Sequence, residues 1–190
     1  CCRPQRSLAR TEAVAAAQNN RLNMARIVQK FGGTSVADLD RIRAVAQRIK
    51  AEVDEGNQVA VVVSAMSGTT NQLVEWATDV GKMHDAREYD VIVATGEQVT
   101  VGLLAIALQN IGVDARSWLG WQIAVRTDDI HSSARIEDID VSRLEDRLAQ
   151  GQVAVVAGFQ GISAEGRITT LGRGGSDTSA VALAASLNAD

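Results

Sequence analysis

The sequence predicts an α/β fold built on a largely parallel sheet, and three observations support this prediction. Short apolar runs rich in β-branched residues alternate with longer segments whose apolar residues recur at helix spacing. Hydrophobic residues make up 46% of the chain but aromatic residues only 3%, so Ala, Val, Ile and Leu must fill the core. Such a core is usual where helices cover a parallel sheet.

The elements are expected in a regular order, punctuated by glycines. The runs 59–63 and 153–157 are continuous and apolar, as in buried parallel strands. Residues 119–140 fit no regular pattern, and we expect irregular or edge structure there. The expected series is a strand at 27–29, a helix at 38–55 stopped by Gly56, a strand at 59–63, a helix from about 71 to 80, a segment 90–93 leading into Thr95-Gly96-Glu97, a helix at 99–111 closed by Gly112, a strand at 113–118, a helix at 141–150 ended by Gly151, a strand at 153–157 and a helix at 176–187.

The run Thr170-Leu171-Gly172-Arg173-Gly174-Gly175-Ser176-Asp177 predicts a site for an anion. Its glycines allow backbone N–H groups to approach a ligand closely, and the helix start behind them adds unpaired donors. Glycine-rich loops often only turn the chain, but a second run, Lys30 to Ser35, follows the first strand. Because ligands bind at the carboxyl edge of open α/β sheets, both runs are expected at one site.

Composition excludes several other classes of protein. The net charge of −4 argues against nucleic acid as the main partner, and the apolar stretches fall short of the roughly 18 residues that a membrane span requires. Cys1 and Cys2 are adjacent, so neither a disulfide framework nor a metal site is expected, and a cytoplasmic location fits. Trp76, Trp118 and Trp121 have no motif context and are expected in packing or interfaces.

The first 23 residues look foreign to the domain that follows. They carry four arginines against one glutamate and show no strand pattern, and Met24 is a plausible start. We expect a disordered or non-native extension at 1–23, with a transit peptide as the alternative. The remainder, 24–190, is then distinctly acidic.

Five runs in this order resemble the aspartokinases, within the amino-acid kinase family, over roughly Met24 to Asp190. The resemblance implies a three-layer αβα fold of the carbamate kinase type. It also implies transfer of the γ-phosphoryl group of ATP, as its Mg²⁺ complex, to the side chain of L-aspartate, which opens the pathway to lysine, threonine, methionine and diaminopimelate. The runs are Lys30-Phe31-Gly32-Gly33-Thr34-Ser35, Val63-Ser64-Ala65-Met66-Ser67-Gly68, Thr95-Gly96-Glu97, Gly158-Phe159-Gln160-Gly161 and Thr169 to Asp177.

The resemblance assigns a role to each site residue. Lys30 would neutralise the transferring phosphoryl group, Arg173 would bind the substrate α-carboxylate and Glu97 its ammonium group. Asp177 would orient the catalytic lysines. Further contacts are assigned to Ser64, Thr70 and Phe159 for the substrate and to Gly32, Gly33, Thr34, Ser35, Gly174, Gly175 and Ser176 for phosphate.

Plainer interpretations stay open for most of these residues. Lys30 could be a solvated surface lysine, and Arg173 could be purely structural. Thr34 and Ser35 could cap the following helix, as could Thr69, Thr70 or Asn71 at the next one. Glu97 and Asp177 could be ordinary carboxylates in a first helical turn, and Phe159 could belong to the core.

The family pattern also continues beyond residue 190. Its second half carries the adenine and ribose contacts and another phosphate-binding lysine, and regulatory ACT domains follow. We therefore expect 24–190 to be the N-terminal portion of the kinase domain, with little or no turnover alone, no tightly bound cofactor and a homo-oligomeric parent. The alternatives are a kinase for another acid, such as glutamate or acetylglutamate, and a noncatalytic module that binds anions or amino acids.

Overall fold

The computed structural model describes residues 24–190, and the predicted extension 1–23 lies outside the described residues. Its centre is a four-stranded parallel sheet in the order β1-β2-β6-β3. The strands are β1 (Arg26–Phe31), β2 (Gln58–Val63), β6 (Val153–Ala157) and β3 (Ala115–Trp118). The two central strands are buried almost throughout, which explains their uninterrupted runs of Val and Ala.

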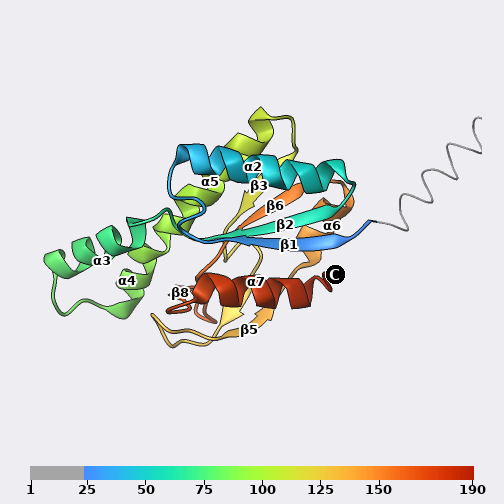
Figure 1. The fold of residues 1–190 in the computed structure, drawn as a ribbon. Helices are drawn as coiled ribbons and strands as arrows, with labels where there is room; N and C mark the ends of the chain where they lie inside the picture. The colour runs from blue at the N-terminus through green and yellow to red at the C-terminus, as the bar shows by residue number, and fades with distance from the viewer. Residues whose placement is uncertain (1–23) are drawn as a thin grey trace, which may run out of the picture.

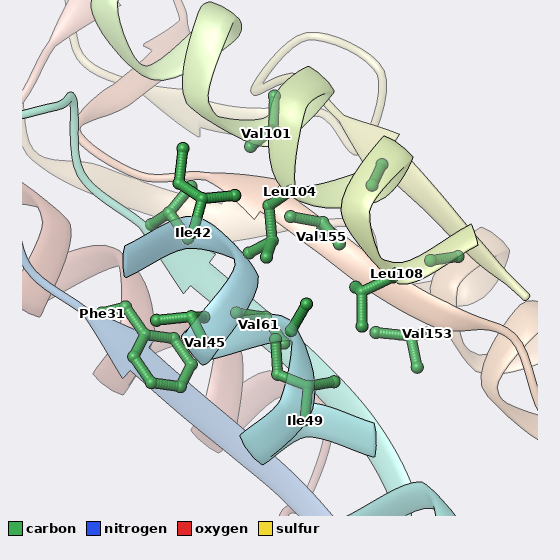
Figure 2. Packing of buried hydrophobic residues seen from close by; sticks show 14 of the residues in the cluster. Phe31, Ile42, Val45, Ile49, Val61, Val101, Leu104, Leu108, Val153 and Val155 are labelled. Carbon is green, nitrogen blue, oxygen red and sulfur yellow. The ribbon is translucent and has the colours of Figure 1, made fainter. Parts of the chain in front are cut away.

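Helices cover both faces of this sheet (Figure 1). On one face lie α2 (Leu39–Asp54) and α5 (Thr95–Asn110), and on the other lie α6 (Ser142–Ala149) and α7 (Gly175–Ser186). The predicted layered α/β fold is therefore confirmed. Figure 2 shows the core on the first face, where α2 and α5 meet over the sheet through Phe31, Ile42, Val45, Ile49, Val61, Val101, Leu104, Leu108, Val153 and Val155.

A second, mixed sheet lies beside α7, in the order β5-β4-β7-β8. It consists of β5 (Ile136–Ile139), β4 (Val125–Thr127), β7 (Gln160–Ile162) and β8 (Ile168–Thr170). The region 119–140, for which only irregular or edge structure was expected, supplies β4 and the edge strand β5. These strands are too short to show a two-residue hydrophobic period clearly, so the sequence pattern did not reveal them.

The remaining helices are α3 (Thr69–Val80) and α4 (Ala86–Val93), which project from the body of the domain (Figure 1). No helix was predicted for 86–93, and α5 begins at Thr95, four residues earlier than predicted. Lys30 lies inside β1 and not after it. Of the three tryptophans, Trp118 packs against the α6–α7 side of the core, whereas Trp76 is 58% exposed.

The two ends of the described chain lie side by side at one edge of the central sheet. The backbone N–H of Asp190 donates to the Arg26 carbonyl at 2.9 Å, and the Arg26 N–H donates to Asp190 Oδ2 at 2.8 Å. The Arg26 guanidinium also donates to the Leu187 carbonyl and to Glu145. These bonds fasten the C-terminal end of α7 to the first strand.

One helical segment, Ala86–Asn110, is long and apolar enough to cross a membrane, contrary to the expectation from the sequence. Half of its most apolar window is buried inside the fold. A core helix such as α5, whose Leu104 and Leu108 are fully buried, meets the same criterion. The segment is therefore weak evidence for a membrane span.

Candidate active site

A cavity of about 870 Å³ lies where the central sheet, α3 and α7 meet. Residues following β1, β2, β6 and β8 line it, so it stands at the carboxyl edge of the parallel sheet, where open α/β sheets bind ligands. Lys30 and Arg173, which are distant in sequence, both line this cavity. Residues of the two glycine-containing runs thus line one cavity, and its role as an anion site stays a prediction.

Lys30 reaches the cavity through an ion pair with the last helix. Its Nζ lies 2.7 Å from Asp177 Oδ1, with the two side chains 28% and 69% exposed. An exposed pair of this kind stabilises a fold by only about 0–1 kcal/mol. Its main consequence is geometric, because it holds one ammonium group at the N-terminal end of α7, beside the glycine run. Lys30 is therefore not a freely solvated surface lysine.

The turn after β6 interlocks with the start of α7. A Cβ atom on Gly158 would lie 2.9 Å from the Ser176 side chain, and one on Gly175 would lie 2.8 Å from the Phe159 ring. Phe159 adopts the left-handed φ of 68°, which is unusual outside glycine. Its N–H donates to Ser179 Oγ at 3.0 Å and its carbonyl accepts from Leu171 N at 2.9 Å. These contacts fix Phe159 as part of the cavity wall.

Two helices begin at the cavity without a side-chain cap. The N-cap residues of α3 and α7 are Gly68 and Gly174, both left-handed, and neither helix has a side-chain cap bond in the described chain. By contrast, Asp38 and Asp85 cap α2 and α4, each accepting a backbone N–H at 2.8 Å. The capping alternatives for Thr34, Ser35, Thr69, Thr70 and Asn71 are therefore wrong. Uncapped helix starts offer N–H donors and a positive dipole end to an anion.

Glu97 supplies a buried carboxyl group in the same cavity. It is 3% exposed, and its Oε1 accepts the Ala65 N–H at 3.0 Å. Its Oε2 has no hydrogen-bond partner among the described residues. Burial raises the pKa of Glu97 to about 7, while the backbone N–H groups of Ala65 and of Glu97 itself act in the opposite direction. A cationic ligand group at Oε2 would restore the charged form.

The structure brings most of the predicted site residues to this cavity. Lining residues include Lys30, Gly33, Ser64, Thr70, Glu97, Phe159, Arg173, Gly174, Gly175, Ser176 and Asp177. Gly32, Thr34 and Ser35 are not among them. The chain turns away directly after Gly33, because Ser35 N and Val36 N both donate to the Gly32 carbonyl. Direct phosphate contacts from these three residues are thus not supported by the geometry.

The sequence motifs missed several lining residues. Tyr89 of α4 and Ser132 of the β4–β5 loop both reach the cavity. Asp90, fully buried behind it, accepts hydrogen bonds from Ser132 and Thr170. An acidic residue within an apolar helical pattern, Asp90-Val91-Ile92-Val93, was the available signal for Asp90. Nothing local in the sequence marks Ser132, because its place depends on a loop folding back over α4.

The fold is a layered α/β fold whose cavity lies at the carboxyl edge of the central parallel sheet, lined by Lys30, Arg173 and the start of α7. Residues 25–190 match the amino acid kinase family, and the chain belongs to that family.

Aspartokinase 2 of Bacillus subtilis is 55% identical over 167 residues, which cover 88% of this chain and 41% of that protein. The aspartate kinase of Synechocystis is similar in structure, with a TM-score of 0.74 and 51% identity over 87% of this chain and 27% of that one.

Aspartokinase III of E. coli, solved in complex with aspartate and ADP, gives a TM-score of 0.73 at 27% identity. That match covers 85% of this chain and 47% of the E. coli chain. The chain therefore spans about two fifths of the length of the B. subtilis relative and less than half of these two structures.

Proposed function

We propose that residues 24–190 carry the aspartate-binding site and part of the phosphate-binding site of an ATP-dependent aspartate kinase. The observation that carries the proposal is the convergence of Lys30, Arg173 and buried Glu97 on one cavity. Similarity to proteins named aspartokinase at 50–55% identity supports aspartate as the acceptor. The nucleotide is proposed by analogy with the E. coli aspartokinase III complex with aspartate and ADP.

The proposed reaction joins a side-chain carboxylate oxygen of L-aspartate to the γ-phosphorus of MgATP. The bond from that phosphorus to the β–γ bridging oxygen breaks, and ADP leaves with the electron pair. The product is 4-phospho-L-aspartate, the first intermediate toward lysine, threonine and methionine. The acceptor carboxyl group is already ionised at neutral pH, so no general base is required. Catalysis of such a transfer depends on positioning and charge neutralisation.

Each charged group of the cavity has a partner in this reaction. The guanidinium of Arg173 suits the α-carboxylate, because its donors form a fork that matches two carboxylate oxygens. The unpaired Oε2 of Glu97 suits the α-ammonium group. Lys30, held by Asp177, offsets the charge of the transferring phosphoryl group. The uncapped starts of α3 and α7 add N–H donors. We expect this kinase in the cytoplasm.

The test is an assay of the longest natural polypeptide that contains residues 24–190. Aspartate-dependent release of ADP, together with trapping of the acyl phosphate by hydroxylamine, is the expected result. Glutamate and N-acetylglutamate are assayed beside aspartate, and preference for either one would assign the chain to another kinase of the family. Residues 24–190 by themselves are expected to show little or no turnover, because they span about two fifths of the B. subtilis relative.

A substitution separates substrate binding from a purely structural role of Arg173. Arg173→Ala is expected to raise the KM for aspartate by about ten- to a hundredfold, the value of a lost charge-assisted hydrogen-bond pair. Arg116→Ala is the matched control, since Arg116 is also exposed but lies on β3 and is not among the residues lining the cavity. Unchanged aspartate binding in Arg173→Ala would refute the proposed role, and unchanged thermal stability would exclude unfolding as the cause.

A further inference from the structure

Behind the cavity, Asp90 gathers a set of polar groups that the proposed chemistry does not use. Asp90 lies on α4 and is fully buried. Its Oδ2 lies 2.7 Å from His131 Nδ1, and its Oδ1 accepts the Thr170 hydroxyl at 2.6 Å. The Ser132 N–H donates to both carboxyl oxygens at 3.1 Å. The Asp90 side chain thus binds two segments, the loop at 131–132 and the strand end at Thr170, which are far apart in the sequence.

The residues that Asp90 holds belong to the cavity wall. Ser132 and Thr170 both line the cavity, and Thr170 precedes the segment Leu171-Gly172-Arg173 by a single residue. The loop and this segment are also joined directly, because Ala134 N donates to the Thr170 carbonyl at 2.9 Å. A Cβ on Gly172 would lie 3.2 Å from the Ser132 carbonyl, so the two backbones pass closely. The position of Arg173 therefore depends on where the loop 130–134 lies.

The conformation of Ser132 shows that the loop needs this support. Ser132 adopts a φ of 65°, in the left-handed region that non-glycine residues rarely occupy. A strained backbone of this kind persists only where surrounding bonds over-determine it. The two bonds from its N–H to Asp90 supply that constraint. Removing the Asp90 carboxyl group would leave a buried donor on Thr170 and half-buried donors on Ser132 and His131 without this acceptor.

We infer that Asp90 is a positioning residue for the amino-acid acceptor: it fixes the loop 130–134 against 170–173 and thereby the place of Arg173. This inference rests on the proposed function for its kinetic consequence but not for its structural one. It predicts that disturbing Asp90 changes recognition of the acceptor amino acid and leaves the nucleotide side of the cavity unchanged. Asp90 itself does not line the cavity and would touch neither substrate.

The kinetic test compares Asp90→Ala with Asp90→Asn in the longest natural polypeptide containing this chain. Asp90→Ala is expected to lower kcat/KM for aspartate at least about tenfold while the KM for ATP changes less than about twofold. Asp90→Asn keeps an amide oxygen that accepts the Ser132 and Thr170 donors, so it should recover to within about threefold of wild type. Asp79→Ala, an exposed residue of α3, is the control.

A second measurement is independent of catalysis. Amide hydrogen exchange in Asp90→Ala should accelerate at least about tenfold within 130–134 and 170–173 and stay unchanged in α2 and α5. If Asp90→Ala does not fold, the isosteric Thr170→Val, which removes only the hydroxyl bond to Asp90 Oδ1, replaces it and should give a smaller change in the same segments. An exchange increase spread evenly over α2 and α5, or an unchanged kcat/KM for aspartate in an active enzyme, would overturn the inference. Absence of aspartate-dependent activity in wild type would refute the proposed function. The hydrogen-exchange pattern would still decide whether Asp90 positions the loop 130–134.

Discussion

The two glycine-containing runs, 30–35 and 170–177, look alike in sequence but contribute to the cavity in different ways. Gly174, Gly175 and Ser176 of the second run line the cavity directly, as does Arg173. In the first run only Lys30 and Gly33 reach it. Gly33 also packs on the turn after β2, where an added Cβ would lie 2.9 Å from the Ala65 carbonyl. That same Ala65 donates its N–H to Glu97.

Apart from Lys30, the first run therefore acts on the cavity through the neighbouring turn after β2. By letting the backbone of Gly33 approach Ala65, it supports the turn whose N–H binds the Glu97 carboxyl group. The second run presents its own backbone and its arginine at the cavity. A glycine in a loop can thus signal either a ligand or a close packing contact, and sequence alone does not distinguish them.

The largest expected effect concerns Lys30, the one side chain of the first run with a charge at the cavity. Lys30→Met is expected to lower aspartate-dependent kcat more than about a hundredfold, because the transferring phosphoryl group would lose its cation. Lys82→Met, at an exposed position between α3 and α4, is the control and should keep wild-type activity. Near-normal turnover in Lys30→Met would remove the only direct chemical role given to the first run.

The next effect concerns Glu97 and requires no ligand. The pKa of Glu97 is raised by burial from 4.5 to about 7, so the folded protein binds a proton more tightly than the unfolded chain. The free energy of unfolding therefore falls progressively as the pH rises from 4.5 to 7, by about 3 kcal/mol in total, because the folded protein disfavours the ionised form of Glu97. Glu97→Gln should raise the free energy of unfolding at pH 7.5 and not at pH 4.5. Urea denaturation at both pH values measures this, and equal gains at the two would contradict it.

A smaller difference is expected between glycines of the two runs. Gly33→Ala forces the Ala65 backbone to move, which we expect to cost about 2 kcal/mol of stability, as overpacking usually does. Gly174→Ala meets no atom within 4 Å but must keep a φ of 72°, which costs about 1 kcal/mol. Chemical denaturation of both variants gives the comparison. A larger loss of stability in Gly174→Ala than in Gly33→Ala would contradict the conclusion that Gly33 is the glycine required for close packing.

The smallest effect is expected at Thr34 and Ser35. Neither residue lines the cavity, and Asp38 caps the helix that follows. Thr34→Ala and Ser35→Ala should therefore change kcat and both KM values less than about twofold. Thr70→Val, at a residue that does line the cavity, serves as the matched comparison in the same assay. A tenfold rise in the KM for ATP in Thr34→Ala would restore the phosphate contact expected from the sequence.

The sequence predicted the central sheet well, because its signal is local. The run Val59–Val63 is buried residue by residue, and the helix predicted at 38–55 is α2 with Asp38 as its cap. The strand β4, which pairs with distant β7, and the helix α4, whose Asp90 is bonded by distant Thr170, were missed, and β5 was too short to show a period. Lys30 and Arg173 were correctly expected in one cleft, because each lies near the carboxyl end of a strand. Asp90 and Ser132 required the three-dimensional path of the β4–β5 loop.

The hydrogen bonds between Arg26 and Asp190 make circular permutation of residues 24–190 feasible. Since both ends of the described chain meet at one corner of the sheet, a short linker could join them without crossing the cavity. New termini could then be opened at the exposed residues 82–85 between α3 and α4. Such a circular permutant would keep every hydrogen bond described around Asp90 and Glu97, and an appended domain would attach at the projecting α3–α4 pair (Figure 1).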